Sequence, residues 1–74
     1  MDMRRLVGRN VLRIRKSKEI TQERLAEISG FSQQYISGLE KGQTVVTVYE
    51  LSVALGVNFI ELLKPDAQAR RERD

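Results

Sequence analysis

Hydrophobic residues recur along this chain at intervals of three and four positions, the period of an α-helix, and no alternating strand pattern persists. Between Met3 and Ser17, for example, Val7, Val11 and Ile14 form one apolar stripe while the charged residues lie elsewhere. Four shorter segments with helical spacing follow. The pattern therefore predicts an all-α fold, a compact bundle of five helices whose first helix spans residues 3–17.

Helix start and stop signals delimit the second and third predicted helices. Thr21 suits the N-cap of the second, because its hydroxyl can accept a hydrogen bond from an unpaired amide of the first turn. That helix is expected to stop at Ser29-Gly30. Ser32 suits the N-cap of the third helix, which runs to about Lys41 and ends at Gly42. Only a tight turn is left between the two helices.

Similar signals predict a fourth and a fifth helix. Thr44 can cap the fourth, which is expected to run from about Val45 to Leu55. Asn58 followed by Glu61 has the form of a capping box and opens a short fifth helix. The apolar residues of this last helix are Phe59, Ile60, Leu62 and Leu63.

Beyond Pro65 the apolar period is lost, so we expect a folded domain over residues 1–65 and a charged tail over residues 66–74. The chain has no apolar run near the roughly 20 residues that cross a bilayer, and no secretory signal. We therefore expect no membrane contact and a cytoplasmic protein.

Composition narrows the function classes. With 74 residues, 41% hydrophobic and 31% charged, the chain is expected to form one small globular domain. It contains no Cys and no His, which removes disulfides, the usual zinc ligands and an imidazole partner for a nucleophile such as Ser37. No phosphate-cradling glycine loop or buried carboxylate pair is apparent. We therefore expect no enzyme activity, no metal or other cofactor, and no small-molecule ligand.

Charge is distributed unevenly along the chain. The net charge is +3 and the isoelectric point is about 9.7, values that are compatible with a polyanionic partner. Residues 4–18 contain no acid, and for any single Arg among them a solvated position on the first helix is the simpler interpretation. The basic residues of this segment are Arg4, Arg5, Arg9, Arg13, Arg15, Lys16 and Lys18.

Residues 22–40 have the spacing of two short helices that pack at a steep angle across a turn. Ala26 stands where a small side chain lets the second of these helices approach the first, and Gly30 can adopt the left-handed conformation of the turn. Ile36 and Leu39 then point into the core. This combination predicts a helix-turn-helix, a unit that usually reads DNA.

With these residues in place, the chain resembles the phage-repressor and Cro-like helix-turn-helix proteins, the Xre family, and also the controller proteins of restriction systems. The resemblance rests on Val7-Gly8 with Arg15, residues 20–26, residues 30–42, Leu51, residues 54–57 and residues 61–63. Gln43 stands where many relatives have Pro, and Arg24 stands where an acidic residue is common. The resemblance implies a lambda-repressor-like bundle and sequence-specific binding of double-stranded DNA by a small transcriptional regulator, a repressor or controller.

The same resemblance implies which residues contact DNA, with the helix over about 32–41 in the major groove. Gln33 and Gln34 are the expected base contacts, since a glutamine amide matches the donor and acceptor of adenine, and Ser37 can add a hydroxyl. The expected phosphate contacts are Gln22, Ser32, Tyr35, Lys41, Gln43 and Thr44. For Tyr35, packing of the ring on the helix surface is an equal alternative.

Two further expectations concern contacts between helices and between subunits. Arg15 and Glu40 are expected to form a structural ion pair, as the equivalent residues do in similar proteins. A homodimer on a palindromic operator is expected, because so small a domain reads few base pairs. The candidate interface residues are Phe59, Leu62 and Leu63. Taken singly, each is expected in the core rather than at the interface, because part of the last helix must close the core, and Phe59 is the preferred exposed one.

A protein-binding module is the main alternative, because the same fold can serve as an antitoxin or adaptor. The absence of Arg or Lys at the two expected base-contact positions is compatible with it. A steep salt dependence of binding would favour DNA. The sequence does not distinguish a repressor from an activator.

Overall fold

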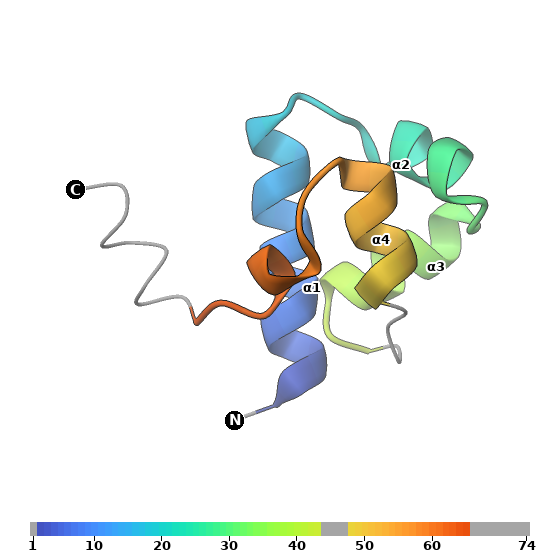
Figure 1. Cartoon of the computed structure of the whole chain (residues 1–74). Helices are drawn as coiled ribbons and strands as arrows, with labels where there is room; N and C mark the ends of the chain where they lie inside the picture. Colours follow the sequence, from blue (N-terminus) through green and yellow to red (C-terminus); the bar gives the residue numbers. More distant parts are fainter. Residues whose placement is uncertain (1, 44–47, 66–74) are drawn as a thin grey trace.

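The computed structural model describes residues 2–43 and 48–65, and these residues form helices joined by turns (Figure 1). The elements are α1 (Met3–Ser17), α2 (Gln22–Ser29), α3 (Gln33–Glu40), α4 (Val48–Leu55) and the 3-10 helix η1 (Phe59–Leu62). Helix α1 runs along one side of the fold and packs against α3, α4 and η1, while α2 packs against α3 and α4. The predicted all-helical class is confirmed for the described ranges.

The first three helices begin at the residues that the sequence indicates. Helices α1 and α2 also end there, whereas α3 ends at Glu40, one residue before the expected end. Asp2 caps α1 by accepting a hydrogen bond from the amide of Arg4 at 3.0 Å. Thr21 caps α2 with its hydroxyl, and Ser32 caps α3 in the same way, each accepting from an amide three residues on at 3.0 Å. Gly30 ends α2 with a φ of +81°, the left-handed conformation expected of it.

The last two elements differ from the prediction. The expected cap Thr44 and helix start Val45 lie outside the described residues, and the described part of α4 begins at Val48. The predicted fifth α-helix is instead the single 3-10 turn η1, whose backbone hydrogen bonds span three residues. Pro65 explains the short element, because a proline has no amide hydrogen and disfavours a helical conformation in the residue before it. Asn58 caps η1, whereas the Glu61 carboxylate pairs with Lys64 at 3.1 Å.

A single apolar core holds the described elements together. Every element contributes at least one buried side chain to it: Val7, Val11, Ile14, Leu25, Ala26, Ile36, Leu39, Leu51, Leu55 and Leu62. Gly8 lets α1 and α3 approach closely, because a Cβ at this position would lie 2.0 Å from the carbonyl oxygen of Leu39. In the described ranges, no helix has both the length and the apolar character required to cross a bilayer.

Asn10 is a fully buried polar residue that sequence reasoning missed. Its Nδ2 donates to the carbonyl oxygen of Leu62 at 2.9 Å and to that of Lys64 at 2.8 Å. These hydrogen bonds fasten the end of η1 to α1 across more than fifty residues of sequence. They therefore fix how residues 58–64 lie on the core.

Candidate nucleic-acid interface

Helices α2 and α3 form the expected helix-turn-helix. The turn between them contains Gly30, Phe31 and the cap residue Ser32. Ile36 and Leu39 of α3 are fully buried against the core. Because Ile36 and Leu39 face the core, the opposite side of α3 faces outward.

The outward face of α3 begins with two glutamines. Gln33 and Gln34 occupy the first turn of α3 and are exposed, and neither amide has a hydrogen-bond partner among the described residues. Ser37 follows one turn later and is half-buried. This end of α3 therefore presents unpaired amide donors and acceptors to the surroundings, beside the positive end of the helix dipole.

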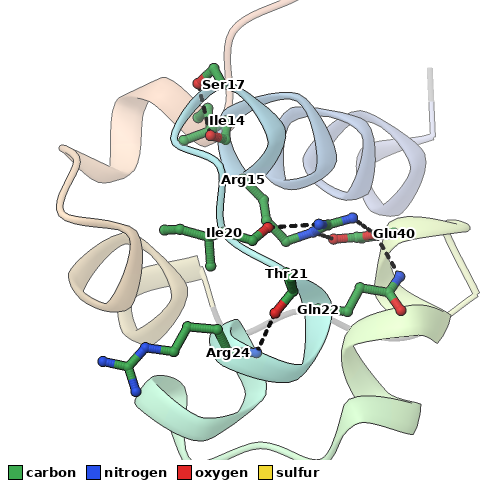
Figure 2. A network of polar contacts seen from close by, with 8 residues as sticks. All are labelled: Ile14, Arg15, Ser17, Ile20, Thr21, Gln22, Arg24 and Glu40. Atoms are coloured by element: carbon green, nitrogen blue, oxygen red, sulfur yellow. Dashed lines mark hydrogen bonds and ion pairs between the residues drawn. The ribbon is translucent and has the colours of Figure 1, made fainter.

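Arg15 and Glu40 join α1 to the last residue of α3, as Figure 2 shows. Arg15 Nε donates to Glu40 Oε2 at 2.7 Å, and Nη2 donates to Oε1 at 3.2 Å. Arg15 Nη1 also donates to the carbonyl oxygen of Ile20 at 2.8 Å. The two side chains are only 10% and 5% exposed, so this is a buried two-point ion pair with further hydrogen bonds.

Gln22 has a role within the protein that sequence reasoning did not identify. Its Nε2 donates to Glu40 Oε1 at 2.8 Å, so that the first residue of α2 is tied to the last residue of α3 (Figure 2). The half-buried Gln22 side chain retains an amide oxygen and a second amide hydrogen that no described residue uses. Its expected phosphate contact remains a prediction.

The other expected phosphate contacts lie at both ends of α3. The Ser32 hydroxyl oxygen accepts the capping hydrogen bond, which leaves its own hydrogen able to donate. The half-buried Tyr35 ring packs on Phe31 with centroids 4.8 Å apart. Lys41 and Gln43 follow α3 and are exposed, while Thr44 lies outside the described residues.

The three residues expected at a subunit interface have different environments. Leu62 is 0% exposed and belongs to the core, so we withdraw it from the candidate interface. Leu63 is half-buried against the same core, and Phe59 is 48% exposed. Sequence reasoning missed three other exposed apolar residues in this part of the fold, Tyr49, Val53 and Ile60. Tyr49 and Val53 stand four apart and off the apolar stripe of α4, a spacing that the sequence already contains.

Comparison with known proteins decides the family. A family model described as helix-turn-helix, HTH_3, matches residues 11–62. The chain belongs to this helix-turn-helix family. It is 56% identical over 68 residues to the uncharacterized HTH-type transcriptional regulator y4dJ of Sinorhizobium fredii, and the match covers 88% of each chain. It is 35% identical over 66 residues to control protein C.SmaI of Serratia marcescens, covering 85% of this chain and 79% of that protein.

A solved structure supports the same assignment. The restriction-modification controller protein C.AhdI from Aeromonas hydrophila has 32% identity and a TM-score of 0.76, with 80% of this chain and 94% of that chain covered. The predicted resemblance to Xre-type regulators and controller proteins is thereby confirmed. As a member of this helix-turn-helix family, the chain is a DNA-binding transcriptional regulator, and the alternative of a protein-binding module is not favoured.

Proposed function

We propose that this regulator binds a palindromic operator as a two-fold homodimer, with α3 of each protomer in the major groove. The observation that carries the proposal is the exposed, unpaired pair Gln33 and Gln34 at the N-terminal end of α3. In helix-turn-helix proteins, this end of the second helix contacts base edges. Because its ligand is DNA, we place the protein with the nucleoid in the cytoplasm.

In the proposed complex, Gln33 and Gln34 read bases and Ser37 adds a hydroxyl contact. A glutamine amide can donate to N7 and at the same time accept from the N6 amino group of adenine, and a two-point contact of this kind discriminates by about 1–3 kcal/mol. The side chains have no internal hydrogen bonds to break, so this discrimination is not offset by lost contacts within the described protein.

Phosphate contacts on both sides of α3 fix its position in the groove. At the N-terminal ends of α2 and α3 we propose the second amide hydrogen of Gln22 and the hydroxyl groups of Ser32 and Tyr35. At the other side we propose Lys41 and Gln43, with Thr44 beside them in the sequence. These groups carry no base information, so each should strengthen binding to all sequences alike.

The subunit contact is proposed for the exposed apolar residues of α4 and η1: Tyr49, Val53, Phe59 and Ile60. The two elements pack against each other, and we propose that their exposed apolar side chains form one surface. A large contiguous patch of exposed apolar side chains on a small domain marks an interaction surface. The restriction-modification controller C.AhdI and control protein C.SmaI support a regulator of the controller type.

Selection of bound fragments from a random DNA pool tests this function. We expect recovered sequences with two-fold symmetry and half-sites centred about one helical turn, roughly 34 Å, apart. The affinity of the protein for DNA should also fall steeply as the salt concentration rises from low to moderate. Failure to enrich any sequence would contradict specific recognition, and enrichment of a single unsymmetrical site would contradict the homodimer.

A further inference from the structure

A shallow hollow lies beside the C-terminal end of α3, at the opposite end of that helix from Gln33 and Gln34. Its volume is about 210 Å³, and it is lined by Arg5, Arg9, Glu40 and Lys41. Two of the three cations come from the N-terminal half of α1, a part of the chain to which the proposed function assigns no role. The hollow therefore brings together basic side chains that lie more than thirty residues apart in sequence.

Two glycines build the hollow. Gly8 brings the backbone of α1 against the end of α3, and Arg5 and Arg9 precede and follow it on the same helix. Gly42, with a φ of +77°, leaves room for the stem of Arg5, because a Cβ on Gly42 would lie 2.7 Å from Arg5 Cγ. The close approach of the two chain segments thus positions Arg5 over the turn that follows α3.

The balance of charge in the hollow favours an anion. The Glu40 carboxylate already accepts three hydrogen bonds, two from Arg15 and one from Gln22, so its charge is offset from the protein side. The carbonyl groups of Gly38 and Leu39 at the end of α3 accept hydrogen bonds from the amides of residues 41–43. The other three side chains that line the hollow, Arg5, Arg9 and Lys41, are basic and exposed. Guanidinium and ammonium groups so arranged match a phosphate.

We propose that Arg5 and Arg9 of α1, together with Lys41, bind a phosphate of the DNA strand that borders the groove holding α3. This inference rests on the proposed function, in which the Gln33 end of α3 enters the groove. The eight residues of α3 span about 12 Å, which is also about the width of the major groove. The far end of α3, with the hollow beside it, is therefore placed to reach the backbone at the groove edge.

The test measures how binding depends on salt. Wild type, Arg5→Gln, Arg9→Gln and the double variant are titrated with a duplex carrying the selected operator and with a scrambled duplex of equal length. Each lost phosphate contact is expected to lower the slope of log K against log salt by about 0.9, and to weaken binding about five- to tenfold near 0.1 M salt. The loss should be the same on both duplexes, because phosphate contacts do not read sequence. Glutamine keeps the Cβ and Cγ methylenes that pack on Gly42.

Lys18→Gln is the matched control. It removes one exposed positive charge from the other end of α1, about 14 Å along the helix axis from Arg9. Lys18→Gln should leave the slope of log K against log salt at its wild-type value. Arg5→Lys and Arg9→Lys should have slopes close to that of wild type, since they keep the positive charge. A double variant with the wild-type slope, or an equal loss in Lys18→Gln, would overturn the phosphate site while leaving the proposed function intact. If wild type bound neither duplex, both would fail together.

Discussion

The Glu40 carboxylate is the group whose removal should most damage this fold without touching the apolar core. In Glu40→Ala, Arg15 loses both hydrogen bonds to the carboxylate and keeps only the carbonyl oxygen of Ile20, while Gln22 loses its acceptor. The Arg15 side chain is only 10% exposed, so its charge remains largely cut off from water. Leaving one partner of a buried ion pair unpaired costs about 3–5 kcal/mol.

That cost is comparable to the whole stability of the domain. A core of this size supplies a net stability of about 3–5 kcal/mol, so most Glu40→Ala molecules should be unfolded at room temperature without denaturant. Urea titration followed by the helical circular dichroism signal measures the effect directly. Replacing both charges with apolar residues, in Arg15→Met with Glu40→Leu, should recover much of the loss, because no buried charge is then left unpaired.

A surface ion pair supplies the matched control. Glu27 on α2 pairs with Arg24, but these side chains are 67% and 60% exposed. Glu27→Ala removes the same kind of carboxylate from a helix and should cost no more than about 1 kcal/mol, because water and salt screen the pair. If Glu40→Ala were no more destabilising than Glu27→Ala, the argument from burial would be refuted.

Three other predictions follow from single side chains. Asn10→Ala should lower the free energy of unfolding by about 2–4 kcal/mol in urea titrations, because two backbone carbonyls near η1 lose their donor; a loss below that of the surface control would contradict this. Phe59→Glu should convert the proposed dimer to monomers in sedimentation equilibrium, and an unchanged dimer would exclude this surface. Gln33→Ala should relax preference at one base position per half-site by about 1–3 kcal/mol, whereas Lys41→Gln should weaken all sequences alike; uniform weakening in Gln33→Ala would argue against base contact.

The features that the sequence predicted correctly depend on residues close together in the chain. The caps Thr21 and Ser32 and the turn residue Gly30 act within one helical turn, so their local spacing is sufficient evidence. In the segment from Phe59 to Leu63, apolar residues fill nearly every position, and a single turn does not establish which of them face inward. For this reason the sequence left Leu62 as a candidate for both the core and the interface, and its burial places it in the core.

Contacts between residues far apart in the sequence could not be predicted from local sequence patterns. The hydrogen bonds of Asn10 join residues 52 and 54 positions apart, and the one between Gln22 and Glu40 spans 18 positions. No period or cap in the sequence indicates such pairs, because an asparagine or glutamine has the same local preferences on a surface as in a buried network. The pairing of Arg15 with Glu40 was anticipated only through the resemblance to known regulators.

The residues that hold α3 in place are different from those proposed to read DNA. Gly8 sets the distance between α1 and α3, Glu40 fixes the C-terminal end of α3, and Ser32 caps its N-terminal end. Gln33 and Gln34 share none of these contacts. Substitutions at the two glutamines should therefore change the free energy of unfolding by no more than about 0.5 kcal/mol, the usual range for surface positions. Since α3 is fixed before DNA arrives, binding costs mainly the ordering of a few exposed side chains, and sequence preference can change at these two positions without loss of the fold.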